Sequence, residues 1–278
     1  MEDATADSRL FLIGSAASQA MSPGLWNPLL EQLGSSWTYE AWDVPAEQAM
    51  TRVRGRLLDR DVVAANVTMP HKQWAAGTAD SSTDAVQLSG ACNLLVRQGR
   101  RLHGHNTDIT AAAVLLGNRY QRHALLLGAG GAARAALIAL DRNVGKVSIT
   151  DRDPNASGDL LHLALDLGID AQAVTWQQAQ DLASEASLIV NATPIGKGIS
   201  DGPAWGDGPV AADALVYDFV YAGHVTASIA KAREAGATCV DGWDHLREQA
   251  VAMVPLLGLD GAADSLLAES LDGLKSRH

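Results

Sequence analysis

One stretch of the chain has the residue types that bind the pyrophosphate of a dinucleotide. Residues 125–134 read LLLGAGGAAR, which is an apolar run, a G-x-G-x-x-A turn and the start of a helix. Gly128 permits the tight turn, Gly130 lets the backbone approach the pyrophosphate, and Ala133 lets the helix pack closely on the strand. The pyrophosphate would then meet the helix amides from Gly131 onward. A plain strand–helix turn is the competing interpretation, and the strand before the turn and the helix after it favour cofactor binding.

An acidic turn lies at the distance from this loop where such motifs bind the adenosine ribose. Asp151-Arg152-Asp153 ends the next predicted strand, about 20 residues after the glycines. Carboxylates there accept hydrogen bonds from the ribose 2′-hydroxyl and repel a 2′-phosphate, whereas Arg152 could hold that phosphate or stack on adenine. Two acids against one arginine predict a preference for NAD over NADP. A solvated turn ahead of Pro154 is the alternative interpretation.

Three polar residues near strand ends could do chemistry outside this loop. Lys72 follows an apolar strand and lies in the first turn of a helix that we expect Pro70 to start, where the helix dipole disfavours a cation. A local rule broken at a strand end indicates a functional site, although a flexible surface lysine is the favoured interpretation on this feature alone. Asp108 precedes the predicted helix 109–116 and is equally well explained as an N-cap. Asn93 either begins a hairpin strand, where asparagine is a poor strand former, or caps a turn.

Strand and helix patterns alternate almost throughout the chain, which predicts an α/β protein with largely parallel sheets. Before residue 109 the patterns predict strands at 9–14, 37–44 and 62–67, helices at 22–34 (with Ser22 as its N-cap) and 45–59, and an antiparallel hairpin over 92–103 that turns at Gln98-Gly99. From His123 onward they predict strands at 124–127, 147–150, 188–191 and 215–219, with helices between them.

These elements predict an N-terminal α/β domain followed by a dinucleotide-binding domain of the Rossmann type. We expect the substrate-binding and catalytic domain over residues 1–108 and the Rossmann domain over residues 109–242. Residues 243–278 would contain two C-terminal helices, at 243–257 and 260–274, that pack back on the first domain.

Composition argues against several classes of function. The chain has 278 residues, a formal net charge of −11 and no basic run longer than Arg100-Arg101, so nucleic acid is a poor partner. Its apolar runs fall far short of the ~20 residues of a membrane span. Residues 1–8 lack the basic start of a signal peptide, so we expect a short disordered leader. With only two cysteines and no disulfide framework, we expect a cytoplasmic protein. Two distant cysteines, and the pair His103 and His105 without a third ligand, lead us to expect no metal site.

Several of these residues lie within motifs that resemble one known family. The motifs occur in order and at the family's spacings: ANVTMPHK at 65–72, GACN at 90–93, NTD at 106–108, GAGGAAR at 128–134, NATP at 191–194 and YDFVY at 217–221. From about Leu10 to Gln249 the chain resembles the shikimate dehydrogenases, which include the quinate/shikimate dehydrogenases. The resemblance implies reversible, NAD(P)-dependent reduction of the C3 ketone of 3-dehydroshikimate to shikimate. The implied partner is a small ring carboxylate, and a homodimer is compatible with the sequence.

The same resemblance assigns roles to residues of this chain. Lys72 would donate a proton to the ketone oxygen as hydride arrives, and Asp108 would hold its ammonium and hydrogen-bond a ring hydroxyl. The implied substrate-binding residues are Ser22, Thr68, Asn93, Tyr221 and Gln249. The implied cofactor-binding residues are Gly128, Ala129, Gly130, Gly131, Ala132, Asp151, Arg152, Asp153, Asn191, Thr193 and Gly242.

The chain departs from the family's pattern in residues expected around the substrate. Ala20 stands where one of two serines usually grips the substrate carboxylate, Leu94 replaces a threonine, and Asp244 replaces a glycine. Residues 243–245 would lie by the substrate or the nicotinamide. These departures leave open a related ring acid such as quinate and, from another class, a nucleotide-binding sensor that has lost catalysis. The intact pair of Lys72 and Asp108 argues against the sensor.

Overall fold

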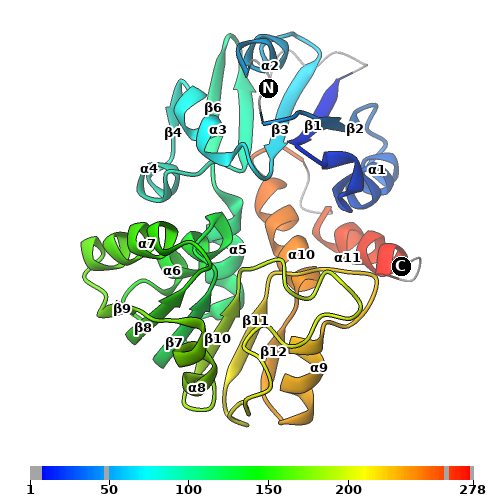
Figure 1. The fold of residues 1–278 in the computed structure, drawn as a ribbon. Coiled ribbons are helices and arrows are strands. Elements are labelled where there is room, and N and C mark those ends of the chain that lie inside the picture. The colour runs from blue at the N-terminus through cyan, green and yellow to red at the C-terminus, as the bar shows by residue number, and fades with distance from the viewer. Residues whose placement is uncertain (1–7, 47–49, 260–262, 276–278) are drawn as a thin grey trace. The chain divides into compact units, whose positions relative to one another are not determined.

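The computed structural model describes residues 8–46, 50–259 and 263–275, and it divides the chain into two compact units (Figure 1). The first unit is drawn from residues 1–108 and 249–277, and the second from residues 109–248. Both divisions fall within helices, because α5 (Thr107–Leu116) and α10 (Gly242–Met253) each begin in one unit and end in the other. The described part of the chain after α10 therefore belongs to the first unit, and the division lies inside α10.

The first unit contains a mixed sheet that places the end of one strand beside the start of another. Its strands are β1 (Arg9–Gly14), β2 (Thr38–Asp43), β3 (Val62–Val67), β4 (Ser81–Ser82), β5 (Leu94–Gln98) and β6 (Arg101–His105), in the order β2-β1-β3-β5-β6-β4. β1 pairs in parallel with β2 and β3, whereas β5 pairs antiparallel with β3 and β6. Because Asn66 of β3 pairs with Leu94 of β5, the end of β3 lies beside the start of β5.

Helices cover both faces of this sheet. They are the 3-10 helix η1 (Ala17–Gln19), α1 (Ser22–Gln32), α2 (Met50–Leu57), α3 (Lys72–Thr78), α4 (Asp84–Ser89) and α11 (Ala263–Lys275). On one face, Phe11 and Val67 of the sheet share a core with Leu57 of α2. α1 packs against α11, and its Trp26 stacks on Tyr39 of β2 with ring centroids 6.0 Å apart.

The second unit is a Rossmann fold. Its strands are β7 (Gln121–Leu127), β8 (Val144–Thr150), β9 (Ala171–Ala173), β10 (Leu188–Asn191), β11 (Leu215–Asp218) and β12 (Thr238–Val240). All neighbours pair in parallel in the order β12-β11-β10-β7-β8-β9. This is the strand order 3-2-1-4-5-6 of a doubly wound sheet, which binds its ligand outside the carboxyl ends of the strands, where the order reverses at β7.

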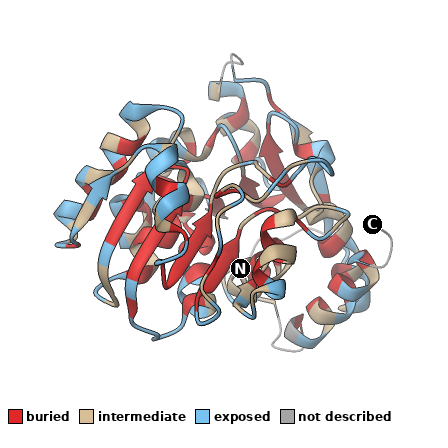
Figure 2. Ribbon diagram, turned by 60° about the horizontal axis from the view of Figure 1, so that its bottom comes forward, coloured by how far each residue is buried: buried red, intermediate tan, exposed pale blue. Residues whose placement is uncertain are grey.

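Helices on both faces explain why the second half of the strand before the glycine turn, residues 124–127, is entirely apolar. They are α6 (Gly131–Leu140), α7 (Pro154–Asp166), α8 (Trp176–Leu182) and α9 (Ala227–Glu234). Leu126 of β7 shares a core with α6 and α7, while Leu125 and Leu127 share one with α8 and α9. A parallel strand buried on both faces loses the alternation of polar and apolar residues. Residues 123–127 of β7 are all buried, and Figure 2 shows strands of this sheet in the red of buried residues.

The predicted α/β class is confirmed, and the strands expected at 9–14, 62–67 and 188–191 have those bounds. Other boundaries differ. Ser22 is the first residue of α1, not its N-cap, and Met21 holds the cap position. The helix expected to start at Pro70 begins at Lys72. Gln98 pairs with Arg101, so the hairpin turns one residue later than expected, through Gly99 at φ 62°.

The strands that sequence patterns missed, β4, β9 and β12, are two or three residues long. They are too short to show an alternation of polar and apolar side chains. The helix expected over 45–59 is α2, with residues 47–49 outside the described residues, and residues 260–262 of the last predicted helix also lie outside them. None of the helices in the described ranges is long and apolar enough to span a membrane.

Candidate active site

Lys72 and Asp108 form an ion pair at the edge of the first sheet. Lys72 is the first residue of α3, after the turn that follows β3, and Asp108 is the second residue of α5. The Lys72 Nζ lies 2.6 Å from the Asp108 Oδ2, with 24% of the lysine side chain and 6% of the aspartate side chain exposed. The interpretation of Lys72 as a flexible surface residue is therefore wrong. Asp108 is also not an N-cap, because it lies inside the helix and pairs with the lysine.

Asn93 supports the other oxygen of this carboxylate. Its Nδ2 donates to the Asp108 Oδ1 at 2.8 Å and to the Thr107 Oγ1 at 3.0 Å. Its Oδ1 accepts from the Thr107 backbone amide at 2.8 Å. Asn93 thus caps the start of α5 and also fixes Asp108. It directly precedes β5, which begins at Leu94, so its role as a cap describes it better than that of a strand residue. A carboxylate that accepts from an amide on one oxygen and from an ammonium on the other is oriented for proton chemistry at that ammonium.

Two further asparagines, which sequence analysis did not select, hold these segments together. The Asn66 Nδ2 donates to the Asn93 carbonyl at 3.2 Å, and its Oδ1 accepts from the Tyr39 hydroxyl at 2.7 Å. The Asn106 Nδ2 donates to the Ala91 carbonyl at 2.9 Å, which ties the segment before Asp108 to the segment before Asn93. The available signal was an asparagine inside the apolar strand β3, because a buried amide needs partners.

Three more predicted substrate residues belong to the same unit. Thr68 follows β3, and a Cβ on Gly14 would overlap its side-chain methyl group, so the end of β1 packs closely against this turn. Ser22 starts α1, and within the described ranges neither its hydroxyl nor that of Thr68 has a hydrogen-bond partner. Gln249 lies half-buried in α10. Tyr221, the remaining predicted substrate residue, follows β11 in the second unit.

The glycine turn in the second unit has the geometry that a dinucleotide needs. Gly128 has φ 97°, and a Cβ there would lie 2.9 Å from the Ala192 carbonyl oxygen. A Cβ on Gly130 would meet nothing within 4 Å, which leaves open space in front of α6. The amides of Gly131 and Ala132 lie in the first turn of α6, where they have no acceptor within the helix. These residues fit a bound pyrophosphate.

The acidic turn after β8 is tied to this loop. The Asp151 Oδ2 accepts from the Ala129 amide at 2.8 Å, and its Oδ1 accepts from the Asp153 amide at 2.9 Å. Asp153 caps α7, with its Oδ1 accepting from the Asn155 amide at 2.9 Å. Arg152 is exposed between them. Both acids therefore shape the backbone of this turn, and the carboxylate of Asp151 is held beside the glycine loop.

Asn191 and Thr193 organise the loop that follows β10. The buried Asn191 donates through Nδ2 to the Ile195 carbonyl at 2.9 Å and to the Asp218 Oδ1 at 2.8 Å. Its Oδ1 accepts from the Thr193 hydroxyl at 2.6 Å and from the Thr193 amide at 3.1 Å. The side-chain groups of Asn191 are thus all engaged within the protein, so we expect it to shape a cofactor loop and not to contact the cofactor.

Gly242 allows the start of α10 to lie against the segment after β11. A Cβ there would lie 2.5 Å from both the Tyr221 nitrogen and the Val220 carbonyl carbon. The rings of Tyr221 and Trp243 lie 5.9 Å apart as a result of this approach. A close approach of two backbones explains the glycine without any contact to a cofactor.

The structure gives Asp244 a structural explanation that the sequence comparison lacked. Its Oδ2 accepts from the Asp241 amide at 3.0 Å, while the Asp241 Oδ1 accepts from the amides of Trp243 and Asp244 at 3.0 and 3.1 Å. The two aspartates thus cap α10 reciprocally. His245 is buried, with its Nδ1 2.6 Å from the Tyr217 hydroxyl. Asp244 is therefore weaker evidence for an altered substrate than the sequence alone indicates.

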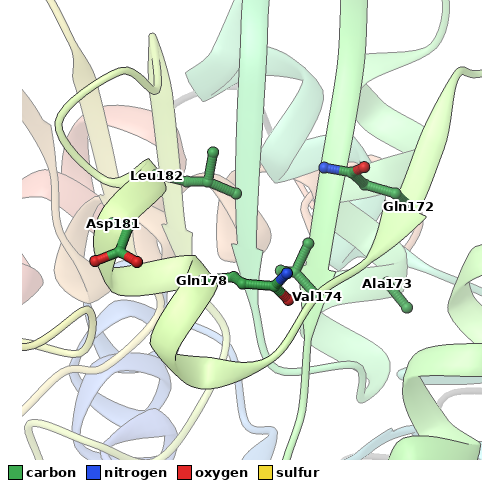
Figure 3. Close-up of a pocket in the computed structure, with 6 residues that line it drawn as sticks. All are labelled: Gln172, Ala173, Val174, Gln178, Asp181 and Leu182. Carbon is green, nitrogen blue, oxygen red and sulfur yellow. The ribbon is translucent and has the colours of Figure 1, made fainter.

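A separate hollow of about 290 Å³ lies between β9 and α8. Figure 3 shows Gln172 and Ala173 on the strand side and Gln178, Asp181 and Leu182 on the helix side. The Gln178 side chain is occupied in the capping box of α8 with Thr175, and Gln172 donates to Ser148. The hollow contains none of the predicted site residues and offers no converging set of reactive groups.

Three comparisons agree with the motifs. The family model described as the shikimate dehydrogenase substrate binding domain matches residues 12–95. A shikimate dehydrogenase (NADP(+)) of Brucella abortus is 35% identical over 255 residues, which cover 87% of this chain and 86% of that protein. The shikimate 5-dehydrogenase of Thermus thermophilus, solved with NADP(H) and shikimate, is 30% identical with a TM-score of 0.79, over 96% of this chain and 99% of that one. The quinate dehydrogenase of Corynebacterium glutamicum, solved with NAD, is 25% identical with a TM-score of 0.84, over 96% and 99% of the two chains.

Proposed function

Because this chain belongs to the shikimate dehydrogenase family, we propose that it oxidises a ring hydroxyl of shikimate reversibly with a nicotinamide dinucleotide. In the other direction it reduces the C3 ketone of 3-dehydroshikimate. The observation that carries this proposal is the contact of 2.6 Å between Lys72 and the buried Asp108, within the family's own motifs.

The Lys72–Asp108 pair performs the proton transfer. During reduction the Lys72 ammonium donates a proton to the ketone oxygen, and during oxidation the neutral amine accepts the hydroxyl proton. Asp108 holds the Nζ at the position where this exchange occurs, because Asn93 fixes its second oxygen. A bound nicotinamide supplies or accepts the hydride at the same carbon.

The remaining predicted residues of the site bind the ring. The hydroxyls of Thr68 and Ser22 and the amide of Gln249 present hydrogen-bonding groups in the same unit as Lys72. We assign Thr68, Asn93 and Gln249 to ring hydroxyls and Ser22 to the carboxylate, and we retain Tyr221 as a proposed substrate-binding residue. Ala20 leaves this carboxylate with fewer hydroxyl partners than the family usually provides. Quinate or a related ring acid is therefore the alternative substrate.

For the cofactor, we propose that Gly128 to Ala132 bind the pyrophosphate and that NAD is preferred over NADP. Asp151 supports this preference, since its carboxylate is held beside the Ala129 amide, where a 2′-phosphate would meet negative charge. Known relatives use either cofactor: the Brucella abortus enzyme is named for NADP(+), and the Corynebacterium glutamicum structure holds NAD. Arg152 is the residue of this turn that could accept NADP.

The cofactor preference is tested by comparing kcat/KM for NAD and NADP on one substrate. The wild type should favour NAD, and replacing Asp151 and Asp153 with asparagine should move the ratio toward NADP. Arg152→Ala is the complementary variant and should move the ratio toward NAD. A wild type that favours NADP would show that Arg152 governs the turn.

The function itself is tested by following the absorbance of reduced nicotinamide with shikimate and quinate, each offered with NAD and with NADP. Turnover of either acid supports a dehydrogenase, and the ratio of the two kcat/KM values identifies the better substrate. Binding of the dinucleotide without turnover of any ring acid would instead favour a nucleotide-binding sensor.

A further inference from the structure

Asp218 is a fully buried carboxylate at the end of β11 that the proposed chemistry does not use. Its Oδ2 accepts from the Thr226 hydroxyl at 2.6 Å. Its Oδ1 accepts from the Asn191 Nδ2 at 2.8 Å and from the Val220 amide at 3.0 Å. Burial raises the pKa of this carboxyl, and the hydrogen bonds from Thr226, Val220 and Asn191 oppose that shift.

The donors to Asp218 come from separate segments. Asn191 ends β10 and controls the loop that follows it through Thr193 and Ile195. Val220 begins the segment that carries Tyr221. Thr226 is the N-cap of α9 and also accepts from the Ile229 amide. A single carboxylate therefore connects the loops after two neighbouring parallel strands to the start of a helix.

These loops adjoin the glycine turn. A Cβ on Gly128 would lie 2.9 Å from the carbonyl oxygen of Ala192, which directly follows Asn191. Both loops lie at the carboxyl ends of the strands, where a Rossmann fold receives the dinucleotide. Displacing the Asn191 loop would therefore displace one wall of the expected cofactor site.

We propose that Asp218 is a positioning residue for the dinucleotide, acting through Asn191, Val220 and Thr226. The inference rests on the proposed function, since it takes the carboxyl edge of this sheet as the cofactor site. Burying a carboxylate costs free energy that an apolar residue would not. A carboxylate here accepts from three donors at once, which a neutral asparagine cannot match, because its amide nitrogen only donates.

Asp218→Asn tests the proposal, with Asp213→Asn as the matched control. Asp213 precedes the same strand at its other end, is 70% exposed in its side chain and pairs only loosely with Arg122 at 3.4 Å. The dissociation constants of NAD and NADP are measured by calorimetry on the apoprotein. We expect Asp218→Asn to weaken binding of the preferred cofactor roughly tenfold, as loss of a charge-assisted hydrogen bond would. Asp213→Asn should bind like the wild type.

Amide hydrogen exchange gives a readout that does not depend on the cofactor. In the apoprotein, Asp218→Asn should lose protection at the amides of Thr193 and Val220. The Val220 amide donates to Asp218 itself, and the Thr193 amide donates to Asn191, which Asp218 holds. Protection in β7 should be retained, which shows that the unit is still folded. Wild-type dissociation constants in a folded Asp218→Asn protein would overturn the proposal.

Thr226 provides a second test that remains decisive if Asp218→Asn does not fold. Thr226→Val removes the donor to Asp218 together with the cap of α9, whereas Thr226→Ser retains both. Thr175→Val removes an equivalent cap from α8 without touching Asp218 and controls for capping. Weaker cofactor binding in Thr226→Val alone supports the proposal, and equal binding in all three variants contradicts it. A wild type that binds neither dinucleotide would contradict the proposed function itself.

Discussion

At the scale of single residues, the ion pair of Lys72 and Asp108 is better explained by chemistry than by stability. Taking two charges out of water costs about as much as their attraction returns, so a mostly buried pair is weak evidence for stabilisation. The pair is instead held by donors from Asn93, and Asn93 is held by Asn66. Such a chain of dependent hydrogen bonds fixes the geometry of the two reacting groups.

A cation in the first turn of a helix breaks a local rule, which drew attention to Lys72, but that feature alone favoured a surface lysine and only the family motifs assigned it to catalysis. It could not separate the roles of Asp108, since an N-cap and a partner of a lysine look the same in sequence. Asn66 was missed because its partners are distant in sequence: Tyr39 lies on β2, and Asn93 directly precedes β5. Contacts of this kind depend on strand order, which single residues do not reveal.

Ala20→Ser tests how the substrate carboxylate is held. A serine there would restore one charge-assisted hydrogen bond, worth roughly 1.5–3 kcal/mol, or about one to two decades of affinity. If shikimate is the natural substrate, its KM should fall by that factor at saturating cofactor. If another ring acid is natural, Ala20→Ser should help shikimate and impair that acid.

Ala16→Ser is the matched control, because Ala16 is exposed and precedes η1. It should leave both KM values unchanged. An unchanged KM for shikimate and for quinate in Ala20→Ser would show that the carboxylate binds away from Ser22.

At the scale of elements, the start of α10 depends on the close approach at Gly242. A Cβ at this position would overlap the backbone of Val220 and Tyr221 at 2.5 Å, so Gly242→Ala should destabilise the protein by about 1–3 kcal/mol. Gly158 lies inside α7 with nothing within 4 Å of an added Cβ. Gly158→Ala should therefore stabilise the protein by about 0.5–1 kcal/mol. Urea unfolding measures the free energy of unfolding of both variants. A Gly242→Ala protein as stable as the wild type would show that α10 can shift without cost.

The strand β6 introduces a pH dependence of stability. Burial, and then the neighbouring His103, lower the pKa of His105 from 6.5 to about 4. The unfolded chain therefore binds a proton between these values while the folded protein does not. The contribution of His105 to the free energy of unfolding is fully present above pH 6.5 and is lost as the pH falls toward 4.

His105→Gln should accordingly show a smaller fall in the free energy of unfolding between pH 7 and pH 5 than the wild type. Urea unfolding at each pH measures this difference. His162→Gln removes a histidine from the exposed side of α7 and is the matched control. Parallel pH profiles for His105→Gln and the wild type would contradict the assignment.

At the scale of the whole molecule, the Rossmann unit could be predicted more fully than the first unit. Its glycine turn and buried strands have local signatures, and the order of the parallel strands follows from that fold type. The edge strands β9 and β12 have too few residues for a pattern. In the first unit the hairpin indicated antiparallel pairing, but the contact of α11 with α1 joins the two ends of the chain and has no local signal.

The most direct test of the proposed mechanism compares Lys72→Ala with the wild type in two measurements, kcat for the better ring acid and the dissociation constant of the oxidised cofactor. Positioned proton transfer is worth about 10²–10⁴-fold, so kcat should fall by that factor. The dissociation constant should stay unchanged, because the glycine turn belongs to the other unit. Lys146→Ala, at an exposed position of β8, should match the wild type in both measurements. A Lys72→Ala protein that keeps half of the wild-type kcat would contradict the role of this lysine as the proton donor.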